Sequence, residues 1–370
     1  MGWPEKPAAL SGAAPLDNFI PLSSDDDLTN ANHFFRIQKI RVTELKKASH
    51  GAFDVFEVYP QFGTKTYTLS KCLNDFALHI GCIGQPEGEF DNSEGCYRIK
   101  LQRRDIESMP LSQALSLLPA DALSPMVIGC TAEGSPLIID QATIPNTLIA
   151  GAPGSGKSTL LKVMIENFIA ANVAVTIIDP KMVDFVSFKG RASCSVVSDL
   201  DDVPDLLDAL IVGMDKIYTT LTKRGMLSVA ENNRSAKPKI TPQVIIIDEW
   251  ANLMLHGKEN LNKILLISQK GRAAGISIIL ATQRPSSAIL PGKIKANFSG
   301  RIAMRVSSEM ESRIILDSSH AAHISEPGLA YYVDQNYQKP VYFRVAHNDL
   351  VLSAPVKQKG FWQSFKELVF

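Results

Sequence analysis

The feature that most constrains this chain is a glycine-rich segment set between a strand pattern and a helix pattern. Residues 151–158 read Gly-Ala-Pro-Gly-Ser-Gly-Lys-Ser and fit the motif G-x-x-x-x-G-K-[ST]. The preceding residues, 146–150, are mostly apolar, and residues 159–171 carry apolar side chains at helical spacing. A strand, a glycine loop and a helix in this order distinguish a phosphate-binding P-loop from a glycine-rich turn that binds nothing.

This loop predicts a nucleoside triphosphate as ligand, together with Mg²⁺. Its glycines allow backbone N–H groups to surround a phosphate, and the following helix adds the positive end of its dipole. We expect Lys157 to reach the β- and γ-phosphates and the Ser158 hydroxyl to bind the metal ion. The residues expected to contact the nucleotide are Gly151, Ala152, Pro153, Gly154, Ser155, Gly156, Lys157, Ser158 and Thr159.

A second apolar strand pattern, over residues 242–247, ends in the carboxylates Asp248 and Glu249. A buried strand delivers its last residues to the carboxyl edge of a sheet, where the P-loop also lies. We expect Asp248 to hold Mg²⁺, directly or through water, and Glu249 to polarise the attacking water as a general base. Without a P-loop, the same pair could simply cap the next helix.

Two other strand patterns end in polar residues that could serve the same site. Residues 276–280 lead to Gln283, which is placed to sense the γ-phosphate from a neighbouring strand tip. A polar turn that caps a helix is the alternative. The third strand ends at Asp179, with Lys181 and Asp184 following. These residues could couple the nucleotide edge to a subunit boundary, or they could form only a turn.

The pattern along the chain predicts four segments. Residues 1–33 are rich in Pro, Ser, Ala and Asp and are expected to form a flexible leader. Residues 34–120 mix alternating strand patterns with one amphipathic helix, which predicts a small α+β domain. Residues 121–350 alternate strands and helices, and their unbroken apolar runs predict a mainly parallel, three-layer α/β core. Residues 351–370 read as an amphipathic helix, with packing on its own domain favoured over docking to a partner.

Composition places the chain among cytoplasmic proteins. The five cysteines form no C-x-x-C pair, which indicates a reducing compartment. No apolar run reaches the ~18 residues of a membrane span, and the start lacks a signal-peptide pattern. The net charge is zero, but residues 258–313 carry ten Lys or Arg against three Glu, whereas residues 199–215 carry six Asp and no Lys or Arg. This segregation suggests a directed binding surface, although solvated helix faces would give the same pattern.

Seven short motifs follow one another along the second half of the chain. They are Ala150-Gly151-Ala152-Pro153-Gly154-Ser155-Gly156-Lys157-Ser158, Ile178-Asp179-Pro180-Lys181, Ile247-Asp248-Glu249, Lys270-Gly271-Arg272-Ala273-Ala274-Gly275-Ile276, Ala281-Thr282-Gln283-Arg284-Pro285, Ile294-Lys295-Ala296-Asn297 and Ser312-Arg313-Ile314-Ile315-Leu316-Asp317. In order and spacing, this series resembles the FtsK/SpoIIIE family of double-stranded DNA translocases. The match covers residues 128–348, and a weaker similarity over 36–115 resembles the small collar domain that precedes the motor.

The resemblance implies a RecA-like P-loop NTPase motor, assembled as a ring of six subunits around duplex DNA. ATP would lie between subunits, and its hydrolysis would drive DNA through the central pore. We expect a motor without the membrane-spanning region or the winged-helix orientation domain of chromosome-segregating members. Plasmid or mobile-element transfer, partition and viral genome packaging are the uses considered, and the N-terminal leader or the C-terminal tail could recruit a protein partner.

Such a ring needs a cation that one subunit delivers to the nucleotide of its neighbour. An arginine in this role raises the rate of hydrolysis by roughly 10³–10⁵. Arg272 is the first choice, because Gly-Arg-Ala-Ala-Gly ends a helix and leads into a core strand. A structural ion pair is the alternative for Arg272, and Arg301 and Arg313 are further candidates for the finger.

The expected DNA contacts are three cations around a loop that contains Pro, Ser and Gly. Arg284 precedes this loop, and Lys293 and Lys295 follow it. We hypothesise that they face the pore and contact phosphates, which would give salt-sensitive binding without sequence preference. A solvated loop is the alternative.

Two other functions compete with duplex translocation. A nucleotide-gated scaffold would bind a protein partner without moving DNA, but an intact Glu249 disfavours it, because a mere switch tolerates slow hydrolysis. A single-strand helicase is disfavoured because no aromatic stacking platform lies near the basic loop.

Overall fold

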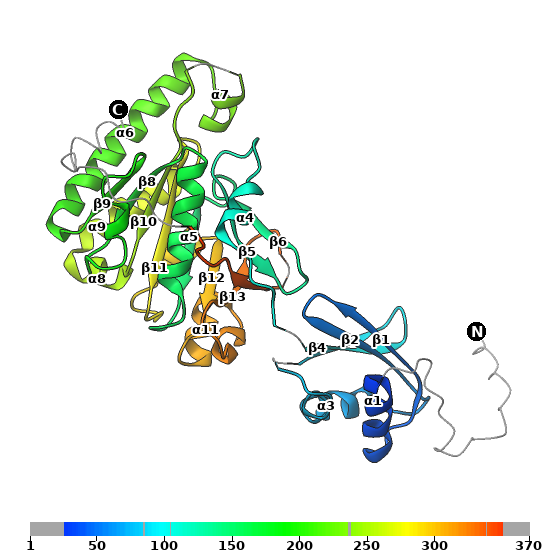
Figure 1. Cartoon of the computed structure of the whole chain (residues 1–370). Helices are drawn as coiled ribbons and strands as arrows, with labels where there is room; N and C mark the ends of the chain where they lie inside the picture. The colour runs from blue at the N-terminus through cyan, green and yellow to red at the C-terminus, as the bar shows by residue number, and fades with distance from the viewer. Residues whose placement is uncertain (1–25, 84–85, 104, 236–237, 338, 351–370) are drawn as a thin grey trace, which may run out of the picture. The chain divides into compact units, whose positions relative to one another are not determined.

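The computed structural model describes residues 26–83, 86–103, 105–235, 238–337 and 339–350 (Figure 1). They divide into two compact units, with the boundary between Asp105 and Ile106. The segment 106–120, which the sequence analysis placed in the small domain, therefore belongs to the second unit. The amphipathic tail predicted over 351–370 lies outside the described residues.

The first unit is a four-stranded antiparallel sheet in the order β1-β2-β4-β3, with helices packed on one face. Alternation along β2 and β4 turns Phe56, Val58, Tyr97 and Ile99 toward that face, where they are buried. This arrangement agrees with the α+β domain predicted from the sequence. The elements are α1 (Asp26–Ile37), β1 (Val42–His50), β2 (Phe53–Pro60), α2 (Thr66–Lys71), α3 (Leu73–Ile80), β3 (Glu87–Asp91) and β4 (Cys96–Gln102).

Aromatic rings join the helices to this sheet. Phe76 on α3 stacks on Phe35 of α1 with 5.0 Å between ring centroids, and it meets Phe56 of β2 edge-on at 5.4 Å. Such pairs add about 0.5–1.5 kcal/mol each to the free energy of unfolding beyond their buried area. The phenylalanines thus form the centre of the core of the small unit.

The predicted leader is wrong in its last part, because α1 begins at Asp26. Asp27 accepts a hydrogen bond from Lys47 Nζ at 2.7 Å, and its Oδ2 lies 3.1 Å from Nη1 of Arg103. Asp27, which lies in the segment predicted to be flexible, therefore attaches α1 to the sheet. The preceding residues, 1–25, lie outside the described part of the chain.

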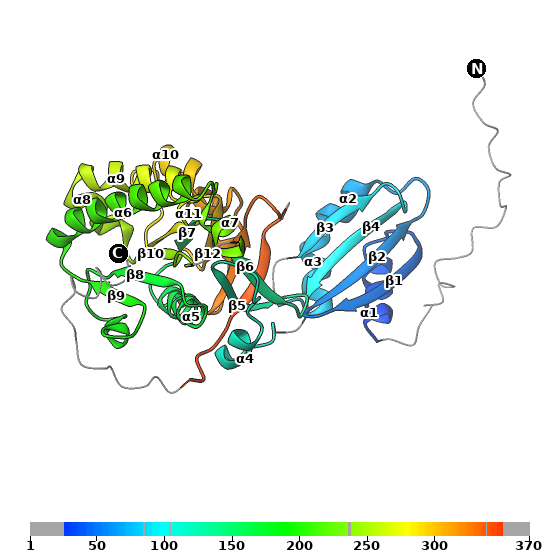
Figure 2. The same ribbon diagram turned by 90° about the horizontal axis from the view of Figure 1, so that it is seen from above.

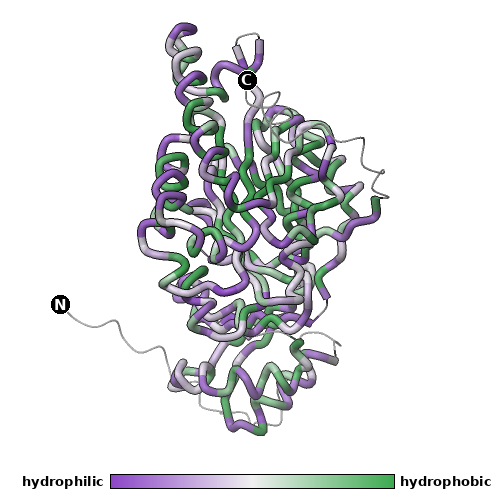
Figure 3. The backbone as a smooth tube through the Cα atoms, turned by 90° about the vertical axis from the view of Figure 1, so that its left-hand side faces the viewer, coloured by the Kyte–Doolittle hydropathy of each residue, from purple (hydrophilic) through white to green (hydrophobic). Residues whose placement is uncertain are grey.

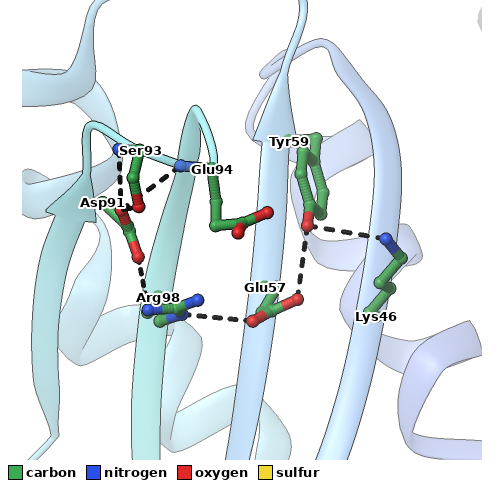
Figure 4. A network of polar contacts seen from close by, with 7 residues as sticks. All are labelled: Lys46, Glu57, Tyr59, Asp91, Ser93, Glu94 and Arg98. Carbon is green, nitrogen blue, oxygen red and sulfur yellow. Dashed lines mark hydrogen bonds and ion pairs between the residues drawn. The ribbon is translucent and has the colours of Figure 1, made fainter.

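The opposite face of the small sheet carries a network of paired charges (Figure 4). Arg98 contacts Asp91 and donates from Nε to Oε1 of Glu57 at 3.1 Å, and Glu57 is its cross-strand neighbour. The Tyr59 hydroxyl donates to Oε2 of Glu57 at 3.3 Å, and Lys46 donates to the same hydroxyl at 3.5 Å. Opposite charges paired across neighbouring strands in this way stabilise the sheet.

The second unit is built on a ten-stranded mixed sheet in the order β6-β5-β14-β13-β12-β7-β11-β10-β8-β9. The run from β12 to β9 is parallel, as predicted, whereas β13, β14, β5 and β6 form an antiparallel arm that the sequence did not predict. The fold is therefore α/β with a mixed, mostly parallel sheet. Hydrophobic segments gather in this sheet (Figure 3).

Helices cover both faces of the parallel strands. Figure 2 shows α6, α8, α9 and α10 along one face and α5 on the other. The elements of the parallel part are β7 (Asn146–Ala150), α5 (Lys157–Ala170), β8 (Ala174–Ile178), η2 (Val186–Phe188), β9 (Cys194–Val197), η3 (Leu200–Asp202), α6 (Val203–Lys223), α7 (Val229–Ser235), β10 (Gln243–Ile247), α8 (Trp250–His256), α9 (Lys258–Lys270), β11 (Ile276–Thr282), α10 (Gly292–Asn297) and β12 (Gly300–Met304). The remaining elements are α4 (Leu111–Ser116), β5 (Pro125–Thr131), β6 (Pro136–Asp140), α11 (Glu309–Leu316), η4 (His320–His323), β13 (Leu329–Val333) and β14 (Val341–Val345).

The charge segregation seen in the sequence is partly neutralised between helices. Lys263 on α9 pairs with Asp208 on α6 at 2.7 Å, and His256 at the end of α8 lies 2.9 Å from Asp201. Part of the acidic segment is therefore paired with basic residues of neighbouring helices.

None of the helices in the described part of the chain is long and apolar enough to cross a membrane.

Candidate nucleotide site

The P-loop lies between β7 and α5, as the motif predicts. All five residues of β7 are buried, which fixes the start of the loop at the carboxyl edge of the sheet. Gly156 caps α5 with φ of +103°, a left-handed conformation that favours glycine. A Cβ atom at Gly156 would lie 3.0 Å from the backbone nitrogen of Gly328. The loop is also tied to its surroundings, because Gly328 N–H donates to the carbonyl of Ser155 at 2.8 Å.

The P-loop lysine meets the first carboxylate across an intervening strand. Lys157 Nζ contacts Oδ1 of Asp248, which follows β10, although β11 separates β10 from β7. Only 4% of Lys157 and 1% of Asp248 is exposed, so the pair is taken almost fully out of water. A buried charge that lost its partner here would be left uncompensated.

The second carboxylate is held at the tip of β11. Glu249 Oε1 accepts hydrogen bonds from the Thr282 hydroxyl at 3.0 Å and from the backbone N–H of Gln283 at 3.3 Å. Glu249 has φ of +66°, which is uncommon for a residue with a side chain and is found most often at functional sites. Lys181 Nζ lies 3.5 Å from the other oxygen, Oε2. The structure thus brings Gln283 beside Glu249 through its backbone.

The segment after β8 supplies two contacts whose partners the sequence did not identify. The Ser158 hydroxyl donates to Oδ2 of Asp184 at 2.8 Å, and Lys181 faces Glu249. Asp179 at the end of β8 is buried, and burial raises the pKa of its carboxyl group, with Asp248 and Asp184 raising it further. The sequence offered only the strand end and the nearby charges as a signal.

The donor set fits Mg²⁺. Within the described residues, Oδ2 of Asp248 and Oδ2 of Asp179 are buried without a hydrogen-bond partner. Carboxylate and hydroxyl oxygens are the ligands that Mg²⁺ prefers, and this ion usually keeps several waters and binds substrate phosphates rather than a complete protein cage. In agreement, the described residues hold no ready cluster of three acidic, His or Cys ligands. Ser158 and Asp248 would therefore hold the metal ion.

The three candidate arginine fingers differ in their surroundings. Arg301 pairs with Asp317, and Arg313 pairs with Glu309 one helical turn away. Arg272 is exposed, and among the residues that the structure describes no side chain pairs with it. It precedes β11, whereas the nucleotide residues follow the strands, so about 20 Å of strand separates Arg272 from its own site.

The three expected DNA contacts do not gather at one place. Arg284 follows the carboxyl end of β11, whereas Lys293 and Lys295 lie on α10, which leads into the amino end of β12. Arg284 and Lys293 are exposed, and Lys295 lies 3.5 Å from Asp317. The single basic loop expected from the sequence is therefore divided between the two edges of the sheet.

Residues 120–287 match the family model described as FtsK/SpoIIIE family. The DNA translocase FtsK of Pseudomonas aeruginosa is 30% identical over 322 residues, which cover 77% of this chain and 40% of the relative. The DNA translocase SftA of Bacillus subtilis is 29% identical over 330 residues, which cover 85% of this chain and 34% of the relative. The chain thus spans two-fifths or less of the length of these relatives.

Two solved structures share the fold. The pCW3 conjugation coupling protein TcpA, in its monomer form with ATPγS, has a TM-score of 0.65 at 19% identity and covers 88% of this chain and 96% of its own. The cytoplasmic domain of the Thermomonospora curvata Type VII secretion ATPase EccC has a TM-score of 0.57 at 23% identity, covering 71% and 34%. The likeness shows a P-loop ATPase fold.

Proposed function

The chain carries a domain of the FtsK/SpoIIIE family over residues 120–287, and on this premise we propose that it hydrolyses ATP and uses the energy to move double-stranded DNA. The proposed working form is a homo-oligomeric ring, with six subunits as the expected number. Relatives over most of the chain are named DNA translocases, which supports DNA as the substrate.

The observation that carries this proposal is the meeting of Lys157, Asp248 and Glu249 at one edge of the parallel strands. Lys157 follows the P-loop, whereas Asp248 and Glu249 are consecutive residues at the end of β10, and the strand order brings these two segments together. A cation for phosphates, a carboxylate for the metal and a second carboxylate for water are the groups that triphosphate hydrolysis needs. A merely structural ion pair would not require the second carboxylate.

The residues divide the chemistry among themselves. Lys157 and the P-loop N–H groups bind the phosphates. Ser158 and Asp248 would hold Mg²⁺, which would neutralise phosphate charge. Glu249 Oε2 accepts the proton of the attacking water, a contribution of about 10²–10⁴ in rate. Gln283 lies at the tip of β11, where its backbone N–H and the Thr282 hydroxyl donate to Glu249. Its side chain can therefore couple the phosphate state to the segment that follows.

A neighbouring subunit would complete the site. Arg272 lies at the far end of β11 from its own nucleotide site, and its exposed guanidinium, which pairs with no side chain in the described part of the chain, fits a role in trans. Lys293 and Lys295 on α10, with Arg284 as a separate contact, are the proposed DNA-phosphate ligands. Transfer of a plasmid or another mobile element, partition and genome packaging remain the proposed uses.

The test is the ATPase rate with and without long duplex DNA at low salt. We expect stimulation by DNA in the wild type, and a fall of about 10²–10⁴ in rate with retained ATP binding in Glu249→Gln. Glu107→Gln is the matched control, because Glu107 is an exposed glutamate of the same unit. Displacement of a third strand from a triplex measures translocation, and native mass measurement with an ATP analogue and duplex DNA measures ring size.

A nucleotide-gated scaffold would give a different outcome in the same assay. A wild-type rate that duplex DNA does not change, together with normal ATP binding, would refute the motor proposal. The scaffold function would then be the better explanation, with a protein as the partner.

A further inference from the structure

One loop, residues 179–184, touches both halves of the proposed catalytic site. Asp184 accepts the hydrogen bond of the Ser158 hydroxyl at 2.8 Å, and Lys181 Nζ lies 3.5 Å from Oε2 of Glu249. Ser158 belongs to the P-loop and Glu249 follows β10, so three segments meet through this loop. Its position between the metal-binding hydroxyl and the general base makes it a candidate for control of hydrolysis.

The loop has buried ends and an exposed apolar tip. Asp179 at its start is buried and accepts from the Lys181 N–H at 3.1 Å, and Phe185 just after its end is fully buried. Between these anchors, Met182 is 55% exposed and Val183 is 74% exposed. Two adjacent exposed apolar side chains beside a nucleotide site are a natural contact for another protein surface.

The two contacts of the loop have different chemical effects. A hydroxyl that donates to Asp184 keeps its oxygen lone pairs available for a metal ion, so this bond orients Ser158. Lys181 instead occupies the oxygen of Glu249 that the described residues otherwise leave to water, because Thr282 and Gln283 bond to Oε1. The lysine therefore opposes the use of Glu249 as a base.

The lysine contact is weak enough to be broken by a docking partner. Its atoms are 3.5 Å apart and 36% of the Lys181 side chain is exposed, and such pairs contribute little to stability. Asp184, in contrast, directly precedes Phe185, whose fully buried side chain anchors this end of the loop. A pull on the tip would thus withdraw Lys181 and leave Ser158 oriented.

The partner that fits the tip is a second copy of this chain. At the opposite edge of the same sheet are the exposed Arg272 and a second exposed apolar side chain, Leu227, which is 85% exposed. Their two segments meet, because Val229 N–H donates to the carbonyl of Ala273 at 2.9 Å. A head-to-tail contact would bring Leu227 to the Met182–Val183 tip and Arg272 to the nucleotide. Contacts of this kind form a ring when the rotation between successive copies closes.

We propose that the 179–184 loop senses the neighbouring subunit: in a lone subunit Lys181 blocks Glu249, and a second copy docked on Met182 and Val183 removes the block. The inference rests on the proposed function and adds its regulation. Hydrolysis would then be slow until the ring has formed, and the cation that completes the site would arrive together with the release of the base.

The first experiment measures kcat and KM for ATP at low subunit concentration without DNA. Lys181→Met should raise kcat about threefold to fivefold with little change in KM, which is the size expected for loss of a weak ion pair. Lys181→Arg should restore the low rate, and Lys189→Met, a lysine of the same segment, should behave as wild type. A lower kcat in Lys181→Met would overturn the proposal, because Lys181 would then be assisting Glu249.

The second experiment tests the tip by sedimentation and by ATPase rate as a function of subunit concentration. Met182→Ser with Val183→Ser should keep the rate of the lone subunit but weaken self-association at least tenfold and remove the rise in specific activity. Ile138→Ser, an exposed apolar residue of β6, is the control. Unchanged self-association in the tip variant refutes the inference whatever the rate, whereas a wild type that never hydrolyses ATP refutes the proposed function.

Discussion

The buried pair of Lys157 and Asp248 predicts that loss of the P-loop lysine damages the fold as well as catalysis. In Lys157→Met the aliphatic stem remains but the ammonium group is removed, so a carboxylate that is 1% exposed loses its charged partner. Its other oxygen has no hydrogen-bond partner among the described residues. Leaving one member of a buried pair uncompensated costs about 3–5 kcal/mol in the free energy of unfolding.

The expected loss is large enough to measure directly. For a unit of this size it corresponds to a fall of about 6–20 °C in the unfolding temperature. With a urea dependence of about 3 kcal/mol per molar, it also lowers the urea midpoint by about 1–1.7 M. The readout is fluorescence of Trp250, which is fully buried in the second unit and donates to the Ile289 carbonyl, after Trp3 and Trp362 are replaced by Phe.

Two controls separate this cause from others. Lys162→Met removes a partly exposed lysine from the same helix and should shift the midpoint only slightly. The double variant Lys157→Met with Asp248→Val should recover most of the lost stability, because replacing both members of a buried pair by apolar groups is often neutral. The reasoning fails if Lys157→Met unfolds at the same urea concentration as Lys162→Met.

Three further predictions follow from particular contacts. Gly156→Ala should lower stability by about 1–3 kcal/mol in thermal unfolding, and more than Gly154→Ala, because both have positive φ but only Gly156 has backbone against its Cβ position. Burial would raise the pKa of Asp27, but the hydrogen bonds of its lysine and arginine partners lower it overall. The stability that Asp27 contributes is therefore present above about pH 4 and is lost as the pH falls through the lowered pKa. Urea unfolding from pH 6 to pH 2 should show a smaller loss of stability in Asp27→Asn than in the wild type. Asn167→Ala should cost about 1–3 kcal/mol in urea unfolding, because the buried amide of Asn167 bonds to both the N–H and the carbonyl of Val127.

The parts of the fold and site that the sequence predicts are those with local causes. The P-loop needs glycine where φ is positive, a lysine at the start of the following helix and an apolar strand before the loop. All three features occur within residues 146–158. Asp248 and Glu249 are found because a buried strand ends at them. The strand–helix alternation likewise predicts the parallel strands.

The parts that the sequence does not predict depend on which segments become neighbours. Nothing in the chain order shows that β11 lies between β7 and β10, so the hydrogen bond from Thr282 to Glu249 cannot be predicted from the sequence. The separation of Arg284 from Lys293 has the same origin, because β11 and β12 present opposite ends to the segment that joins them. α1 was missed because Asp27 reads as a solvated charge until Lys47 and Arg103 are seen beside it.

The P-loop itself is completed by a residue far along the chain. Gly328 donates its N–H to Ser155, and its own carbonyl accepts from the N–H of Val345 on β14 at 2.8 Å. β14 in turn lies so close to β5 that a Cβ at Gly129 would be 1.9 Å from the carbonyl oxygen of Arg344. Because these links are backbone hydrogen bonds and glycine contacts, they leave little room for independent movement. The antiparallel arm therefore forms one structural body with the phosphate-binding loop, and a change in that loop must be shared with β14 and β5.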